Sequence, residues 1–164
     1  MRITLGVDPG TAIVGYAVVS EERSKLKLHV CDVITTPPDM PFPQRLSVIF
    51  HGIAEIIKLY QPQDAAVEEL FFARNARTAI AVGQGRGIIL LACAEAGLPV
   101  GEYTPMQVKQ AVQGYGSATK HQVGEMVKML LNLDAVPKPD DAADAAAIAI
   151  CHLHSSRLST LLKP

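Results

Sequence analysis

The spacing of hydrophobic and polar residues divides the chain into short strands and longer helices. Three apolar stretches follow one another closely near the N-terminus: 3–8, 15–20 and 26–35. The third alternates, with hydrophobic residues at Leu26, Leu28 and Val30, as expected of a strand. Because the links leave no room for helices, the three strands should pair antiparallel. Residues 37–43 hold four prolines and predict a rigid loop.

Beyond this loop the hydrophobic spacing switches between that of helices and that of strands. Residues 44–60 predict an amphipathic helix, because their isoleucines recur three and four positions apart. The later predicted elements are a strand at 64–71, a long apolar helix at 76–96, a strand at 99–103, and helices at 105–113, 119–132 and from 139 into the 150s. This order predicts an α/β fold in one domain, residues 1–164, with a mixed five-stranded sheet and helices on both faces.

Composition restricts the class of protein. The 164 residues are 49% hydrophobic and 19% charged, which does not favour disorder. No fully apolar run approaches the ~18 residues of a membrane span, and Arg2 and Asp8 argue against a signal peptide. The cysteines, Cys31, Cys93 and Cys151, form no Cys-x-x-Cys pair and indicate free thiols in a reducing compartment. We therefore expect a cytoplasmic protein with no membrane partner.

Charge is distributed unevenly along the chain, although its formal net value is only −1. Residues 1–73 carry six basic and nine acidic side chains, a net of −3, whereas residues 74–128 carry six basic and three acidic ones, a net of +3. The middle third is therefore the better candidate for a face that binds a polyanion. On this count alone, ordinary solvated surface charge is the simpler alternative.

Acidic residues stand at the ends of two predicted strands. Asp8 ends the first strand, directly before Pro9 and Gly10, so its carboxylate should point into the crevice where α/β sheets hold ligands. Glu68 and Glu69 follow an apolar strand, and burying them is costly unless they meet water, a cation or a metal. A turn-forming aspartate and a strand that has reached the surface are the plain alternatives.

A further acidic group opens the last predicted helix. Asp141 and Asp144 are three residues apart, so they share one helix face. Helix capping and the helix dipole explain Asp140 and in part Asp141, but Asp144 lies deeper, among alanines that predict burial. No His–Cys cluster competes with these acids, and hard oxygen ligands suit Mg²⁺ or Mn²⁺. Two such ions could activate a water and stabilise the leaving oxygen of a phosphodiester.

These acidic motifs also resemble, in their order and spacing, those of a known enzyme family. They are Gly6-Val-Asp8-Pro-Gly-Thr11, Val67-Glu68-Glu-Leu-Phe71 and Asp141-Ala-Ala-Asp144-Ala145. The other matching stretches are Arg74-Asn-Ala76, Gly85-Arg-Gly87, Gln107-Val-Lys109-Gln110 and Gly116-Ser-Ala-Thr-Lys120. Over nearly its whole length the chain resembles the RuvC family of crossover (Holliday) junction endodeoxyribonucleases, and the resemblance implies a ribonuclease H-like fold.

The resemblance implies the chemistry and its acidic residues. It implies a structure-selective endonuclease that resolves four-way DNA junctions by paired symmetric nicks, in recombination and repair. The implied catalytic residues and metal ligands are Asp8, Glu68, Asp141 and Asp144. The implied cofactor is Mg²⁺, with Mn²⁺ as a possible substitute and two ions in each active site.

The resemblance also implies DNA contacts and partners. Lys109 and Lys120 would hold DNA phosphate, Phe71 would stack on an unpaired base at the crossover, and Arg74 would bind DNA. The enzyme would act as a homodimer, for which the apolar helix 76–96 is the best candidate contact. Its partners would be four-way junction DNA and the branch-migration proteins RuvA and RuvB.

Three residues duplicate or flank the implied site residues: Asp140, Glu69 and Phe72. Because side chains alternate along a strand, only one of Glu68 and Glu69 can share the face that Asp8 uses. We expect Glu68 to do so, and the chain to leave regular strand geometry after Glu69.

Two other functions remain open at this point. Asp8-Pro-Gly-Thr11 resembles the first phosphate loop of actin-like and sugar-kinase-like ATP-binding domains, but those proteins need two such domains and this chain predicts one. An RNA-processing nuclease on the same fold is the other alternative. Gly83-Gln-Gly85-Arg-Gly87 is not a dinucleotide loop, because no strand precedes it; its glycines favour a close helix contact, for which a dimer interface is one candidate. His152 and His154 are expected to be plain surface or packing residues.

Overall fold

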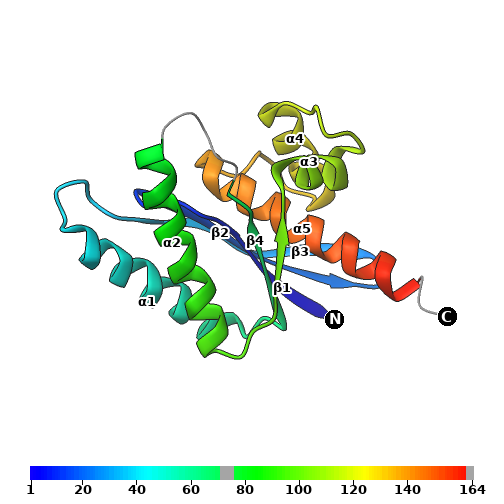
Figure 1. The fold of residues 1–164 in the computed structure, drawn as a ribbon. Helices are drawn as coiled ribbons and strands as arrows, with labels where there is room; N and C mark the ends of the chain where they lie inside the picture. The colour runs from blue at the N-terminus through cyan, green and yellow to red at the C-terminus, as the bar shows by residue number, and fades with distance from the viewer. Residues whose placement is uncertain (71–75, 162–164) are drawn as a thin grey trace.

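A computed structural model describes the backbone of residues 1–70 and 76–161 and the side chains of residues 1–70 and 78–156. Its centre is a five-stranded sheet in the order β3–β2–β1–β4–β5 (Figure 1). The strands are β1 (Arg2–Asp8), β2 (Ile13–Glu22), β3 (Lys25–Thr35), β4 (Asp64–Glu68) and β5 (Val100–Tyr103). The first three pair antiparallel, whereas β4 is parallel to β1 and β5 to β4. The predicted mixed five-stranded sheet is confirmed.

Helices cover both faces of this sheet, as predicted (Figure 1). One face carries α1 (Phe42–Tyr60) and α2 (Ala76–Glu95). The other carries α5 (Asp140–Leu161), with α3 (Pro105–Gln113) and α4 (Lys120–Leu130) packed against it. Strand alternation separates the two cores, because Leu5 and Val7 face α1 and α2 whereas Gly6 faces α5.

The fourth strand is shorter than its apolar pattern suggests. The prediction of a strand over 64–71 is wrong at its end, since β4 stops at Glu68. Its neighbour β5 ends at Tyr103. The last hydrogen bond between these two strand segments runs from the amide of Glu69 to the carbonyl oxygen of Tyr103, at 2.8 Å. A strand cannot continue where its partner has ended. The strand thus ends three residues before the predicted residue 71, and one residue before the departure expected after Glu69.

The first helix begins inside the predicted proline loop. It starts at Phe42 rather than residue 44, with a proline in its first turn. A proline is tolerated there because the first amides of a helix have no partner within it. The loop therefore ends at Pro41.

The helix α5 lies directly on the backbone of β1 and β2. A side chain on Gly6 would collide with the carbonyl oxygen of Ala145, and one on Gly15 would collide with that of Asp141. Glycine lets backbones approach where any Cβ would clash. Because Gly6 and Gly15 have no side chains, the start of α5 can pack against the end of β1 that carries Asp8.

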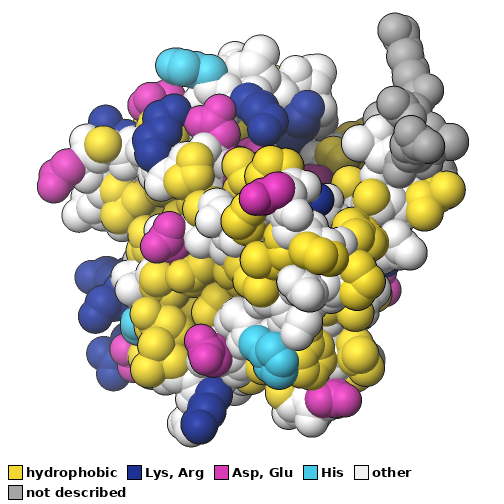
Figure 2. All heavy atoms as spheres, turned by 90° about the vertical axis from the view of Figure 1, so that its left-hand side faces the viewer, with side chains coloured by type: hydrophobic (Ala, Val, Ile, Leu, Met, Phe, Trp, Pro, Cys, Tyr) yellow, Lys and Arg dark blue, Asp and Glu magenta, His cyan; other side chains and the backbone are white. Residues whose placement is uncertain are grey.

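The helix α2 has an apolar outer surface. Among the described residues one segment, Thr78–Glu95, is long and apolar enough to cross a membrane by length and composition alone, and 22% of it is buried. In its middle, Arg86 pairs with Glu102 of β5. Ile80 and Leu91 are 65% and 47% exposed, and Figure 2 shows hydrophobic side chains gathered on the side of the molecule that α1 and α2 form.

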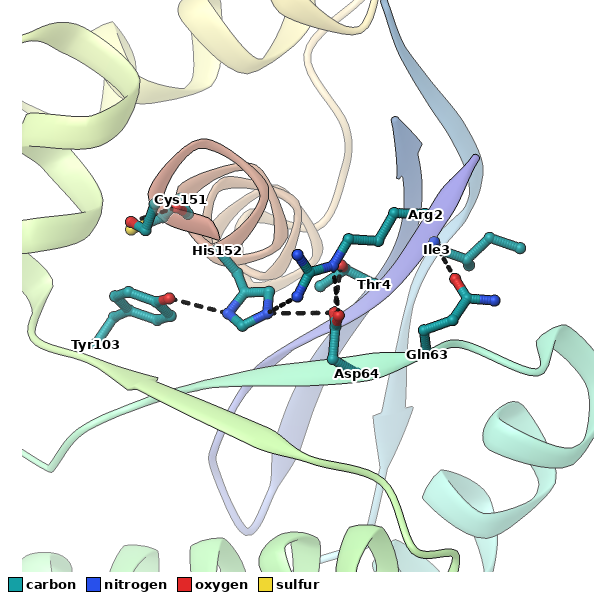
Figure 3. Close-up of polar contacts among 9 residues, drawn as sticks. Arg2, Ile3, Thr4, Gln63, Asp64, Tyr103, Cys151 and His152 are labelled. Atoms are coloured by element: carbon teal, nitrogen blue, oxygen red, sulfur yellow. Dashed lines mark hydrogen bonds and ion pairs between the residues drawn. The ribbon is translucent and has the colours of Figure 1, made fainter. Parts of the chain in front are cut away.

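A polar cluster joins the other end of β1 and β4 to α5 (Figure 3). Arg2 Nε donates to Asp64 Oδ2 at 2.6 Å, and the hydroxyl of Thr4 donates to Oδ1. His152 lies between Asp64 and the hydroxyl of Tyr103, 2.9 Å from Nδ1. Burial alone would raise the pKa of Asp64, but hydrogen bonds from its neighbours, His152 first, hold that pKa below its usual value. His152, expected to be a surface or packing residue, is buried and bonded at both ring nitrogens.

Candidate active site

Two of the predicted site residues end neighbouring strands. Val7 of β1 is paired with Val67 of the parallel strand β4, so Asp8 and Glu68 follow side by side at the carboxyl edge of the sheet. Both side chains lie on the α5 face, because Val7 and Val67 belong to the core on the opposite face. This edge is where α/β sheets hold their ligands.

The first two turns of α5 bring two further carboxylates to the same edge. Asp141 lies beside Gly15, which pairs with Asp8 across the β1–β2 ladder. Asp144 follows one turn later, half-buried between alanines that are buried in the core. The helix therefore carries its acids toward the sheet because its small residues let it come close.

Three of these carboxylates line one cleft of about 280 Å³. Its lining residues come from β1, β4, α3, α4 and α5: Asp8, Glu68, Pro105, Val108, Lys109, Lys120, Val123, Asp144 and Ala147. Asp141 lies outside this lining, yet it is close enough to Asp8 to raise the pKa of that carboxyl. Acids and lysines from across the sequence thus meet at one place.

The acids repel one another in a partly dry environment. Burial raises the pKa of Asp8 to about 8, and the negative charges of Glu68, Asp144 and Asp141 contribute in that order, against a lowering by Lys120. Burial and then Asp144 raise the pKa of Glu68 to about 6, although Lys120 and Lys109 lower it. A divalent cation would relieve this repulsion and stabilise all four ionised groups.

Two capped helices place the lysines. Thr119 and Gln122 form a capping box at the start of α4, and Lys120 is the residue directly after the cap Thr119. Lys120 Nζ lies 2.7 Å from Asp144 Oδ2, and this hydrogen bond raises the pKa of the lysine. Thr104 forms a second capping box at the start of α3, the helix that presents Lys109 to the cleft. Both boxes have the sequence signature Thr-x-x-Gln.

The carboxylates are ligands of the type that a hard divalent cation prefers, but in this structure they lie too far apart to bind one ion together. No three acidic, histidine or cysteine side chains of the described residues stand close enough, as placed, to chelate one ion. Four carboxylates with eight oxygens nevertheless face one edge, and oxygen ligands are those that Mg²⁺ and Mn²⁺ take. Side-chain rotation on binding would be needed to close the site.

Glu69 and Asp140, the acidic neighbours of the predicted site residues, do not line the cleft. Glu69 is exposed and absent from the cleft lining. Asp140 is exposed and pairs with Lys138, 2.9 Å from Nζ to Oδ1; it lines a neighbouring hollow rather than the cleft. Of the predicted DNA-binding residues, Phe71 and Arg74 lie outside the described residues, as does Phe72.

One neighbour of the site was not expected to act there. Arg86 of α2 donates from Nε to the carbonyl oxygen of Glu68 at 3.1 Å. A side chain on Gly85 would come within 2.7 Å of the carbonyl oxygen of Gly10, just after Asp8. The close helix contact predicted from these glycines is therefore, for Gly85, a contact within the chain.

The sequence and fold are similar to those of known junction-cleaving enzymes. The family model of crossover junction endodeoxyribonuclease RuvC matches residues 4–152. The chain is 55% identical over 156 residues to the crossover junction endodeoxyribonuclease RuvC of Desulfitobacterium hafniense (strain DCB-2), covering 95% of this chain and 94% of that protein. The structure of Thermus thermophilus RuvC superposes with a TM-score of 0.91 at 40% identity, over 97% of this chain and 98% of that one. Thermus thermophilus RuvC in complex with Holliday junction substrate gives a TM-score of 0.89 at 38% identity, over 98% of each chain.

Proposed function

The chain belongs to the RuvC family of crossover junction endodeoxyribonucleases, and we propose that it resolves four-way DNA junctions by paired symmetric nicks. The observation that carries this proposal is the meeting of Asp8, Glu68 and Asp144 with Lys109 and Lys120 in one cleft. Acids in contact with a polyanionic substrate repel it unless cations intervene. A pure DNA-binding module would gain nothing from such an arrangement.

We propose Asp8, Glu68, Asp141 and Asp144 as the catalytic metal ligands, with two Mg²⁺ ions in each site and Mn²⁺ as a substitute. Bound ions of this kind supply an activated water and stabilise the charge that develops on the leaving oxygen. The protein's own contribution is to hold the carboxylates on a rigid strand edge and helix start. The raised pKa of Asp8 means that this residue must release a proton before it can act as a ligand.

The two lysines would hold the DNA beside these acids. Lys109 is half-buried and Lys120 exposed, and both reach the cleft, where an ammonium group can neutralise a phosphate oxygen. In the free protein Lys120 is engaged by Asp144, so phosphate and carboxylate would compete for it. Phe71 stays a proposal for stacking on an unpaired base, and Arg74 for a DNA contact.

We propose a homodimer with one active site in each subunit. Two symmetric nicks require two sites related by a two-fold axis. The apolar surface over α2, which includes Ile80 and Leu91, is the best candidate interface (Figure 2), since charged residues are depleted at the core of such contacts. Cytoplasmic location also stays a proposal, which rests on the unpaired pattern of the cysteines in the sequence. The partners RuvA and RuvB stay proposals taken from the family resemblance.

The alternatives predict different substrates. An actin-like or sugar-kinase-like ATP-binding domain finds no support, because the family match spans residues 4–152. An RNA-processing nuclease would cut structured RNA in preference to branched DNA. The deciding experiment incubates the protein with a labelled synthetic four-way junction, linear duplex DNA and structured RNA, each with Mg²⁺ or with EDTA. We expect symmetric nicks in the junction with Mg²⁺ alone; equal cutting of linear duplex, or preference for RNA, would contradict the proposal.

A further inference from the structure

We infer that Arg86 and Gly85 of α2 are positioning residues, which fix the separation of Asp8 and Glu68 from the face of the sheet opposite the cleft. The inference rests on the proposed function, since it assigns those two carboxylates to one metal site. Neither residue lines the cleft. Their effect would pass through the backbone of the two strand ends.

The Arg86 guanidinium holds the end of β4. Its Nε donates to the carbonyl oxygen of Glu68 at 3.1 Å, and one of its terminal nitrogens pairs with Glu102 of β5. The Arg86 side chain is 16% exposed and Glu102 is 47% exposed. One planar group with several fixed donors therefore ties the last residue of β4 to the next strand.

The neighbouring residue, Gly85, holds the end of β1. The backbone of α2 approaches the Pro9–Gly10 turn so closely that a Cβ on Gly85 would stand 2.7 Å from the carbonyl oxygen of Gly10 and 3.0 Å from Cγ2 of Thr11. This turn follows Asp8 directly. Two consecutive residues of one helix thus touch both chain segments that carry the central carboxylates.

This support matters because the two neighbouring strand ends each carry a carboxyl group. The sheet bonding of β4 ends within one residue of Glu68, and the half-buried carboxyl groups of Asp8 and Glu68 repel each other when both are ionised. Repulsion of this kind favours separation of the two strand ends. A helix anchored to both ends opposes it, and thereby keeps the carboxylates close enough to share a cation.

The test measures metal affinity apart from cleavage. Mn²⁺ binding to the full-length protein without DNA is followed by calorimetry, and thermal unfolding is recorded for each variant. We expect Arg86→Gln to weaken Mn²⁺ binding roughly 10–100-fold, the usual loss when an outer-shell partner of a metal ligand is removed. The Mn²⁺ affinity of Arg86→Lys should lie between those of the wild type and Arg86→Gln, because one ammonium group cannot reproduce the several donors of a guanidinium. Glu102→Gln should lower the Mn²⁺ affinity only slightly, since Arg86 keeps its hydrogen bond to the carbonyl oxygen of Glu68.

Arg2→Gln provides the matched control. It breaks an arginine–carboxylate pair at the opposite end of the same two strands, where Asp64 begins β4. It should lower the melting temperature without changing Mn²⁺ affinity. For the glycine, Gly85→Ala should weaken metal binding, whereas Gly87→Ala, with nothing within 4 Å of its added Cβ, should not.

The inference and the proposed function fail separately. Wild-type Mn²⁺ affinity in folded Arg86→Gln and Arg86→Lys, or an equal loss in Arg2→Gln, would overturn the positioning role even if the protein cuts junctions. If Arg86→Gln does not fold, the Arg86→Lys and Gly85→Ala results decide. If the Arg86 variants bind Mn²⁺ more weakly than the wild type, but the wild type does not cut junctions, the proposed function is overturned and the positioning role stands.

Discussion

Gly15 of β2 lies against the carbonyl oxygen of Asp141 at the start of α5, so closely that a side chain on Gly15 would collide with it. Because Gly15 is also the ladder partner of Asp8, this one contact sets the distance between the strand acid and the helix acids. The site therefore depends on a residue that carries no functional group.

Gly15→Ala should disturb both stability and the site. Overpacking a core costs about 1–3 kcal/mol, and here the colliding group is backbone, which cannot turn aside. We expect a lower melting temperature and a loss of magnesium-dependent cleavage larger than the unfolded fraction explains. Gly87→Ala is the control, since it adds a methyl group in open space and should stabilise α2 by roughly 0.5–1 kcal/mol. Unchanged cleavage by folded Gly15→Ala would refute the spacing role.

Most of the fold could be predicted because its signals are local. Hydrophobic spacing, prolines and glycines located the ten elements of the described residues in order. The candidate carboxylates could be found from their places at strand ends and at a helix start, and the resemblance selected four of them. The contacts of Arg86 could not be predicted, since a cation inside an apolar helix does not reveal which carbonyl it meets. Nor could the burial of His152, because its partners Asp64 and Tyr103 lie far away in sequence. Strand β4 ended early for the same reason: its length depends on β5.

Asp8→Asn should separate cutting from binding. The change keeps the shape of the side chain but replaces the carboxyl group of a proposed metal ligand at the cleft by an amide. We expect cleavage to fall by more than the roughly 10–100-fold typical of outer-shell changes. Without metal, junction affinity should persist below about pH 8, where the Asp8 carboxyl is largely protonated, and should increase above it, where one repulsive charge facing phosphate is gone. Gel-shift and cleavage assays on the same junction measure the two effects, and full cutting by the variant would rule out the mechanism.

The stability of the metal-free protein should depend on pH through Asp8. Below the ordinary pKa of an aspartate, folded and unfolded chains both hold the proton. Above it the unfolded chain releases the proton, whereas the folded protein keeps it until pH about 8, so stability decreases as pH rises through this window and then levels off. In EDTA, the melting temperature of Asp8→Asn should therefore exceed that of the wild type by an amount that grows between about pH 5 and pH 8.

Asp64→Asn gives the opposite trend and serves as the control for this titration. Its pKa is lowered in the folded state, so its stabilising effect is present above the ordinary aspartate pKa and is lost in acid. The variant should be less stable than the wild type at neutral pH, with a deficit that shrinks as the pH falls. A pH-independent gain for Asp8→Asn would show that its carboxyl is not buried among like charges.

Lys120→Ala should reveal whether this lysine serves phosphate, Asp144 or both. If it contacts phosphate, junction affinity should fall and the slope of log affinity against log salt should decrease by about one ion. Loss of the 2.7 Å pair with Asp144 should leave metal affinity unchanged or improved, because a competitor of the cation is removed. Lys128→Ala, on the last turn of the same helix, controls for general charge. An unchanged salt slope and unchanged cleavage would identify Lys120 as an ordinary surface lysine.

Glu68 and Glu69 provide the sharpest comparison in the chain, because they are identical, adjacent and point to different surroundings. Glu68 is half-buried, lines the cleft and has a pKa raised to about 6. Glu69 is exposed, and its amide donates to the carbonyl oxygen of Tyr103. Glu68→Gln should therefore abolish magnesium-dependent cleavage with little loss of melting temperature, whereas Glu69→Gln should change both only slightly. Junction cleavage and thermal unfolding of the two variants are measured side by side. If Glu69→Gln is inactive while Glu68→Gln still cuts, the strand register is off by one and the assignment of the ligand at the end of β4 is wrong.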